Sequence, residues 1–349
     1  MRVLLLQSRC THGCVNMVYD VVVVGGGITA ASFVSRLNAL KPELKILVLD
    51  KAMRPGGRLG ARTLDLSTGV HEVDIGAAYL TASSEEFRTQ VAQWLSRGLL
   101  REWTESLWVF DGAKRSESAK GPMRYAAKDG LRSLVADYFS KFAADSPGRI
   151  EYRLQTAIKS LDALEGFGAQ AMVFACPVQQ ALRVIDTAQP PRISHQQRAE
   201  LEQFKSKPVI AAWASFAEVS WPDFRAAFVN QNKTLSLIAD DGSRRGDGAP
   251  VLVVHSSHEF AEEHQIAEGT ALELIGEALK LLDVRAEPII IGQHRWGLAQ
   301  PSTTSDSPFW FDDHRLAICG DEWGGPSKVE TAWLSGARLA DFIAQSKFA

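Results

Sequence analysis

The sequence predicts an α/β protein in which a Rossmann-like dinucleotide-binding domain is interrupted by an inserted α+β domain. Residues 19–24 (YDVVVV) form an apolar run that is typical of a strand buried on both faces. A glycine-rich turn and an apolar helical pattern follow it directly. Near the C-terminus, residues 316–319 and 329–344 again have the patterns of a buried strand and a helix. Both ends of the chain are therefore assigned to one discontinuous nucleotide-binding domain.

The glycine turn has the form Gly25-x-Gly27-x-x-Ala30. In such a turn the first glycine permits a sharp bend, the second lets backbone N–H groups approach a pyrophosphate, and a small third residue keeps the helix close to the strand. A second predicted strand, residues 45–49, ends at Asp50, whose carboxylate is suited to ribose hydroxyls. The order of strand, turn, helix, strand and acid is the context that a dinucleotide site requires.

The composition is that of an ordinary globular protein, with 46% hydrophobic residues, 23% charged residues and a net charge of −3 over 349 residues. The absence of a basic surplus argues against a nucleic-acid partner. No run of about 18 apolar residues is present, so no transmembrane helix is expected. The cysteines form no C-x-x-C pair, and Cys176 and Cys319 follow apolar strand-like runs. We expect buried thiols in a reducing compartment, and therefore a cytoplasmic location.

Residues 1–16 are expected to be a non-structural N-terminal extension. Met17 stands two residues before the first strand, where dinucleotide-binding chains usually begin. The apolar run at residues 3–6 is too short for a secretory signal. The hypothesis is that translation starts at Met17, and the alternative is an ordered N-terminal arm. The intact mass of the natively expressed protein decides between them.

The domains are expected to alternate along the chain. We assign residues 17–82, 130–180 and 290–349 to the nucleotide-binding domain, and residues 83–129 and 181–289 to a substrate domain. Helical periodicity predicts helices within residues 84–101, 130–144 and 268–282. Strands are predicted near residues 150–154, 157–161, 171–175, 209–216 and 251–256.

Two further segments fit a flavin dinucleotide. Gly56-Gly57-Arg58 follows Asp50 at the place where one large group of FAD enzymes passes backbone along the pyrophosphate and flavin. Arg58 would add a charge-assisted contact to a phosphate or flavin oxygen, and a solvated arginine on a surface turn is the alternative. Residues 74–77 (DIGA) resemble a segment that packs against the flavin ring.

The C-terminal segment contributes an acidic residue and a helix start. Asp321 follows the predicted strand 316–319 and could bind the ribityl hydroxyls, or it could be a plain helix cap. The helix that begins near Val329 would direct its N-terminus at the flavin N1–C2=O locus, where the helix dipole stabilises negative charge.

These segments resemble successive blocks of the flavin amine oxidase superfamily, and within it they resemble the renalase family most. The blocks are G-x-G-x-x-A, DKAMRPGGRL, EVDIGAAYLT, QAMVFACP, VVHSSHEF, QHRWGLAQP and CGDEWGGPSKVETAWLSG, and they extend over residues 18–345. The resemblance implies an FAD domain of the p-hydroxybenzoate hydroxylase and amine oxidase type, with FAD bound non-covalently. Together the motifs and the resemblance assign these residues to FAD: Gly25, Gly27, Thr29, Ala30, Asp50, Lys51, Gly57, Arg58, Gly76, Ala77, Ala78, Tyr79, Ile158, Gly320, Asp321 and Val329.

The chain departs from this family at two positions near the expected flavin. Ala78 stands where animal renalases have Gln, and Leu59 stands where Met is common. Because residue 78 is expected close to the flavin, this departure weakens the assignment of the substrate more than the assignment of the cofactor.

The resemblance to renalases implies an FAD-dependent oxidase. Its substrate would be a dihydropyridine such as an isomeric NAD(P)H, with a hydride passed to flavin N5 and electrons passed to O₂ to give hydrogen peroxide. Because the cofactor carries the chemistry, no catalytic side chain and no metal are assigned. The substrate-pocket candidates are Tyr79, His255, Arg295 and Trp296, with His294 beside them. A strand-end histidine and core aromatic residues are the structural alternatives.

Two other functions stay open on the sequence. The first is a flavin-dependent amine oxidase or desaturase, although no lysine can be placed near flavin N5. The second is a flavin-binding protein without turnover.

Overall fold

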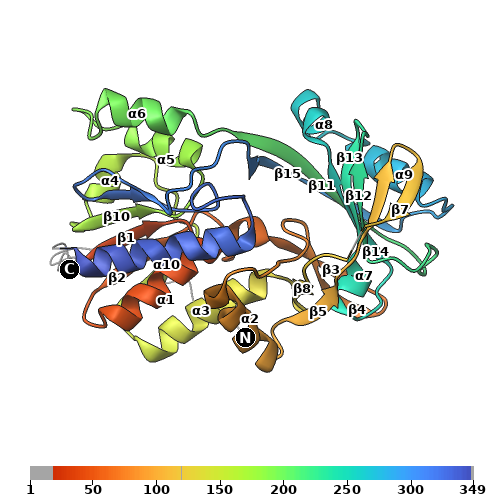
Figure 1. Cartoon of the computed structure of the whole chain (residues 1–349), viewed down its shortest axis with the longest axis horizontal. Coiled ribbons are helices and arrows are strands. Elements are labelled where there is room, and N and C mark those ends of the chain that lie inside the picture. Colours follow the sequence, from red (N-terminus) through yellow and green to blue (C-terminus); the bar gives the residue numbers. More distant parts are fainter. Residues whose placement is uncertain (1–18, 119, 347–349) are drawn as a thin grey trace, which may run out of the picture.

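The computed structural model describes residues 19–118 and 120–346. The expected N-terminal extension lies outside these residues and remains a prediction. Within the described part of the chain, no helix is long and apolar enough to cross a membrane. Two sheets lie side by side in the molecule, each with its own layer of helices (Figure 1).

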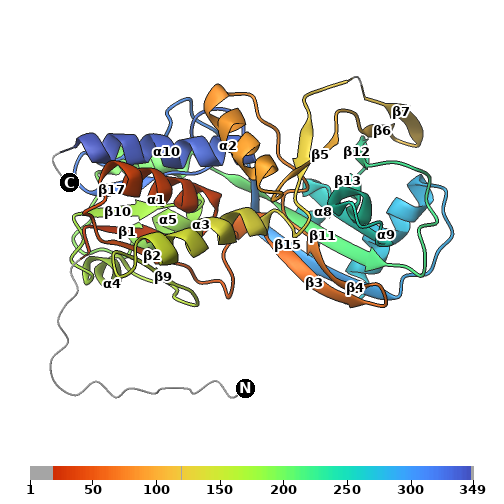
Figure 2. The same ribbon diagram turned by 90° about the horizontal axis from the view of Figure 1, so that it is seen from below.

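The first sheet is the predicted Rossmann-like layer. Its central strand is β1 (Val21–Val24), which pairs in parallel with β2 (Ile46–Leu49) on one side and β10 (Ala171–Phe174) on the other. The first three valines of β1 are buried because helices cover both faces of the sheet (Figure 2). The strand order is β16 (Trp310–Phe311), β17 (Leu316–Ile318), β10 (Ala171–Phe174), β1 (Val21–Val24), β2 (Ile46–Leu49) and β9 (Ile150–Arg153), with only β16 antiparallel.

Among the described residues, seven helices cover this sheet. One face packs against α1 (Ile28–Leu40), α2 (Glu85–Ser96), α3 (Arg132–Asp145) and α10 (Val329–Gln345). The other face packs against α4 (Leu161–Glu165), α5 (Val178–Ile185) and α6 (His195–Glu202). Helices α1 and α10 cross closely at Gly336, where a Cβ atom would lie 2.2 Å from the Thr29 carbonyl oxygen.

The second sheet is seven-stranded and mixed. Helices α8 (His258–Glu263) and α9 (Thr270–Leu281) cover one face, and the hairpin of β3 (Ala61–Leu66) and β4 (Gly69–Asp74) packs on the other. The strand order is β15 (Ile290–Pro301), β11 (Ser206–Ser215), β14 (Val251–Ser256), β13 (Leu235–Asp240), β12 (Ala226–Asn230), β6 (Trp108–Asp111) and β7 (Lys114–Glu117). The remaining elements are η1 (Gly57–Leu59), β3 (Ala61–Leu66), β4 (Gly69–Asp74), β5 (Arg101–Thr104), β8 (Arg124–Ala126) and α7 (Asp241–Arg245).

The fold class agrees with the prediction, but several boundaries differ from those expected. Residues 290–301 form β15 and pair with β11 in the second sheet, which corrects their expected assignment to the nucleotide-binding domain. Conversely, α2 and α6 pack on the first sheet. The strand expected at 157–161 is absent, because Leu161 begins α4 with Ser160 as its N-cap.

Candidate cofactor and substrate site

The first glycine turn lies at the carboxyl end of β1, between β2 and β10. Gly25 has φ +111°, and a Cβ there would lie 2.4 Å from the Ala175 carbonyl oxygen, so the protein itself requires glycine. Gly27 differs, because its φ is −91° and a Cβ would meet nothing closer than 3.9 Å. Contacts within the protein therefore do not require glycine at residue 27. A ligand that approaches the backbone at this residue would require it.

Helix α1 presents an N-terminus without a side-chain cap. Its N-cap Gly27 makes no side-chain hydrogen bond, and the first turn contains no acidic residue. Thr29 and Ala30 in this turn are buried. Unpaired N–H groups and the positive end of the helix dipole make such a terminus suitable for a phosphate.

Asp50 ends β2 beside this turn, as predicted. Its carboxylate accepts hydrogen bonds from the backbone N–H groups of Gly26 (2.8 Å) and Ala52 (2.9 Å). Lys51 is exposed. The segment that leads to Ile158 lies close to Asp50, because the Thr156 N–H donates to the Asp50 carbonyl at 2.8 Å.

Tyr152 on β9 is a neighbour of Asp50 that the sequence did not reveal. Its hydroxyl is buried and has no hydrogen-bond partner among the described residues. Burial and the Asp50 charge raise the pKa of Tyr152, so its hydroxyl stays protonated. The ring stacks on Phe139 at 4.0 Å between centroids.

The second glycine turn is hydrogen-bonded to the first. The Gly56 N–H donates to the Gly26 carbonyl at 2.9 Å, and Gly27 and Gly56 form a parallel bridge. Gly57 has φ +54° and lies against Gly27, with 3.5 Å from its Cβ position to the Gly27 Cα. Two segments that are separate in the sequence thus form one glycine-lined surface.

Arg58 and Asp321 meet as an ion pair. Arg58 Nη1 donates to Asp321 Oδ2 at 3.1 Å, and a second guanidinium–carboxylate contact makes the pair bidentate. The Ser327 hydroxyl also donates to Asp321. Helix α10 has Lys328 as its N-cap and no side-chain cap bond, so Asp321 does not cap that helix. Asp321 is therefore not a cap of α10, which corrects one of the two expected roles, and its role toward a cofactor stays a prediction.

The segment after β4 is fixed against Arg58. The Ala77 N–H donates to the Arg58 carbonyl at 3.0 Å. A Cβ at Gly76 would lie 1.9 Å from the same oxygen, so only glycine fits. Ala78 is buried next in the chain. The expected flavin-facing segment and the second glycine turn therefore form one unit.

Trp296 and His255 reach this unit from the second sheet. Trp296 Nε1 donates to the Ile75 carbonyl at 2.8 Å, and a Cβ at Gly60 would be 2.9 Å from the indole. The His255 ring lies beside the Ile75 backbone, and its Nε2 is buried without a partner in the described structure. Burial lowers the pKa of His255 to about 4, so the imidazole is neutral at pH 7. Tyr79 packs against Trp103, with 6.2 Å between the ring centroids.

Arg295 does not belong to this group, contrary to our expectation. It pairs with Ile210 of β11, whose side chain lies in the core under α8 and α9. Arg295 Nη2 donates to the Ala261 carbonyl of α8 at 3.0 Å. Side chains alternate across a strand, so Arg295 and its neighbour Trp296 face opposite sides of the sheet.

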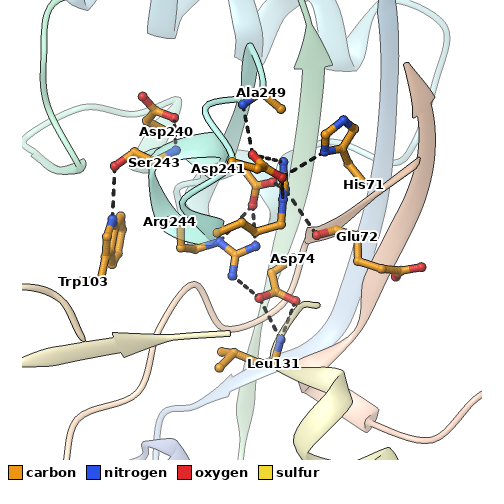
Figure 3. A network of polar contacts seen from close by, with 12 residues as sticks. His71, Glu72, Asp74, Trp103, Leu131, Asp240, Asp241, Ser243, Arg244 and Ala249 are labelled. Carbon is orange, nitrogen blue, oxygen red and sulfur yellow. Dashed lines mark hydrogen bonds and ion pairs between the residues drawn. The ribbon is translucent and has the colours of Figure 1, made fainter. Parts of the chain in front are cut away.

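A buried ionic network holds Asp74, the first residue of the expected flavin-facing segment (Figure 3). Asp74 is 2% exposed and accepts from the Leu131 N–H at the start of α3. Arg244 of α7 pairs with both Asp74 and Asp241. Burial raises the pKa of Asp74, although Arg244 opposes this effect. The network fixes the segment to both sheets.

Two buried glutamates also escaped the sequence analysis. Glu322 is 0% exposed and accepts from the Val178 N–H at 3.0 Å, and burial raises its pKa to about 7. Glu330 accepts from the Ser83 N–H at 3.0 Å and thereby joins α10 to the segment before α2. The sequence signal that could have identified these two glutamates is their position within the CGDEW and VETAW blocks.

Comparisons with known proteins agree with this architecture. The sequence model of a family described as "NAD(P)-binding Rossmann-like domain" matches residues 23–95. A structure assigned as a protoporphyrinogen oxidase from Exiguobacterium sp. 255-15 superposes with a TM-score of 0.68 and 12% identity, over 93% of this chain and 98% of that one. Putrescine oxidase bound to putrescine gives a TM-score of 0.67 and 14% identity, over 94% and 99% of the two chains. The chain has the fold of these oxidases.

Proposed function

We propose that the protein is an FAD-dependent oxidoreductase. The observation that carries the proposal is the convergence of four separate segments on one surface at the carboxyl edge of β1. The two glycine turns bridge at Gly27 and Gly56, and Arg58 joins the second turn to Asp321 and to the segment that begins at Gly76. Ligands of open α/β sheets bind at such an edge, where the strand order reverses.

The residues present fit FAD along its whole length. The free space over Gly27 and the uncapped N-terminus of α1 suit the pyrophosphate. Asp50 and the orphaned hydroxyl of Tyr152 suit the adenosine ribose. Asp321 would hold the ribityl chain. The segment from Gly76 to Tyr79 would line the flavin ring, beside the N-terminus of α10 at Val329.

When bound, FAD would supply hydride acceptance at N5 and electron transfer to O₂, which yields hydrogen peroxide. The protein's part is to bind and orient the substrate. Trp296 offers an aromatic surface, and it is fixed in place through the Ile75 carbonyl. The neutral His255 offers a buried ring nitrogen as a hydrogen-bond partner for a polar substrate atom.

For the substrate we propose a dihydronicotinamide such as an isomeric NAD(P)H, in line with the resemblance of the sequence blocks to renalases. A neutral pocket wall of Trp296 and His255 supports a planar, uncharged ring. The likeness to putrescine oxidase favours a second candidate function, that of a flavin-dependent amine oxidase or desaturase. A flavin-binding protein without turnover is the third.

Anaerobic stopped-flow spectroscopy of the FAD-loaded protein separates these candidates. The substrates are α-NAD(P)H, the 2- and 6-dihydro isomers of NAD(P)H, and simple amines including putrescine. We expect fast bleaching of the flavin absorbance by the dihydropyridines and none by the amines. Bleaching by amines alone would replace the proposal with the amine oxidase, and no bleaching by either would leave the non-catalytic reading. A purified protein that neither contains nor binds FAD would refute the cofactor proposal itself.

A further inference from the structure

Three arginines gather on the first residues of β3, beside the second glycine turn. Arg132 Nη2 donates to the Ala61 carbonyl at 2.9 Å. Arg54 Nη1 donates to the Thr63 hydroxyl at 3.2 Å. Arg62 lies between these two attachment points on the same strand. Side chains alternate across a strand, so Arg62 and Thr63 leave β3 on opposite faces. The charges of Arg54 and Arg62 nevertheless both act on Arg132, and we call these three residues the arginine cluster.

Positive charge in the arginine cluster exceeds negative charge. Burial lowers the pKa of Arg132, and the charges of Arg54 and Arg62 lower it further. The negative charge of Glu72 raises the pKa of Arg132 and so opposes the effect of these two arginines. The Glu72 carboxylate lies 3.5 Å from Arg54, and it also accepts a hydrogen bond from the Thr63 hydroxyl. Asp74, the other carboxylate near Arg132, is already paired with Arg244. Three cations therefore face one available carboxylate.

Arg132 occupies a position that helix electrostatics disfavour. It is the first residue of α3, where the positive end of the helix dipole repels a cation. Its Nε atom is buried and has no hydrogen-bond partner in the described structure. Its side chain packs on Gly56, where a Cβ would lie 3.0 Å from the Arg132 Cγ. An anion at this place would relieve both the repulsion and the missing hydrogen bond.

The arginine cluster is continuous with the expected substrate pocket. Arg62 Nη2 lies 3.3 Å from His294 Nδ1. The His294 ring meets the Trp296 ring edge to face, with 4.4 Å between centroids. A path of polar and aromatic side chains thus leads from Gly56 to Trp296.

We propose that Arg54, Arg62 and Arg132 form a binding site for a phosphate group of a nucleotide. Guanidinium groups match phosphate oxygens in geometry and charge. The phosphate could come from FAD, whose pyrophosphate is expected at the neighbouring glycine turns, or from a dinucleotide substrate on Trp296, and the second source rests on the proposed function. A cationic amine would be repelled here, so the cluster favours the dihydronicotinamide over the amine.

The test uses the full-length chain with single Arg→Gln changes at residues 54, 62 and 132, and the triple variant. Arg285→Gln, at an exposed position after α9, is the control for loss of one positive charge. Three quantities are measured: the FAD dissociation constant of the apoprotein, the dissociation constants of inorganic phosphate and ADP from the FAD-loaded protein by calorimetry, and urea unfolding of each apoprotein. Since these arginines are partly exposed, we expect a loss of about three- to tenfold in affinity per arginine.

The pattern of losses identifies the source of the phosphate. Weaker ADP and phosphate binding with unchanged FAD affinity assigns the site to the substrate, and weaker FAD binding assigns it to the cofactor. Affinities for all three ligands within about twofold of wild type in the folded triple variant would overturn the proposal, as would an equal loss in the Arg285→Gln control. If the wild-type chain does not bind FAD, the proposed function fails, while phosphate and ADP binding to the apoprotein still tests the arginine cluster.

Discussion

Replacing Gly27 with alanine should separate ligand binding from folding. The residue has φ −91°, an ordinary value for an L-amino acid, and the added methyl group would meet nothing closer than 3.9 Å. Alanine is a poorer N-cap than glycine, which lowers stability, but it also reduces the conformational entropy of the unfolded chain, which raises stability. Each effect is about 0.5–1 kcal/mol, and the two have opposite signs. We therefore expect the free energy of unfolding of the apoprotein to change by less than about 1 kcal/mol.

FAD binding should respond much more strongly to the same methyl group. The Cβ would occupy the space through which a pyrophosphate approaches the N–H groups of the α1 terminus. Loss of one hydrogen bond to a charged group costs about 1.5–3 kcal/mol, which corresponds to roughly a ten- to 150-fold increase in the FAD dissociation constant. Fluorescence titration of apoprotein with FAD measures this constant, and urea unfolding of the same sample measures stability.

Two other glycines provide matched comparisons. Gly25→Ala should impair folding itself, because its Cβ would lie 2.4 Å from a backbone oxygen at φ +111°. Gly276→Ala, on α9 with open space around it, should leave FAD affinity unchanged and raise stability by about 0.5–1 kcal/mol. A folded Gly27→Ala variant that binds FAD as tightly as wild type would show that the phosphate does not lie at this turn.

Three further changes test other parts of the site. Asp321→Ala should raise the FAD dissociation constant about ten- to 100-fold and also destabilise the apoprotein, because Arg58 loses its bidentate partner; an unchanged FAD dissociation constant would exclude Asp321 from the cofactor site. Tyr152→Phe should leave the stability of the apoprotein unchanged or raise it by up to about 1 kcal/mol, since the hydroxyl has no partner in the described structure; a clear loss in urea unfolding would contradict this. The pKa of His255 is lowered to about 4 in the folded state from 6.5, so the unfolded chain binds that proton first and the protein loses stability as the pH falls from about 6.5 to 4. His255→Gln should remove this contribution, so that the difference in unfolding free energy between wild type and variant shrinks from pH 7 to pH 4.5; a constant difference would show that His255 does not titrate as its burial indicates.

The sequence by itself determined the Rossmann-like layer. Four valines, a glycine turn and a helical apolar pattern lie next to one another in the chain, and each specifies its element through local geometry and burial. The second strand and Asp50 follow within the same short stretch. These interactions join residues that are close together in the chain, so hydrophobic periodicity and glycine spacing predict them directly.

Pairings between distant residues were decided by the tertiary structure. Arg58 and Asp321 are 263 residues apart, and each was assigned to FAD separately, with no sign that they pair with one another. Trp296 and Arg295 looked equivalent in the sequence, but the pairing of β15 with β11 directs Trp296 toward Ile75 and Arg295 toward α8. A period of two assigns neighbours to opposite faces, but it does not say which face meets the site.

The polar interior between the two sheets was likewise invisible in the sequence. Asp74 and Arg244 are 170 residues apart, and neither has a local pattern that marks it as buried. Burial of such a pair is tolerated because each charge finds partners from other elements, and those partners exist only when both sheets are in place. The sequence therefore determined the first glycine turn and its strand, and the packing of one sheet against the other determined which side chains lie beside the segment from Gly76 to Tyr79.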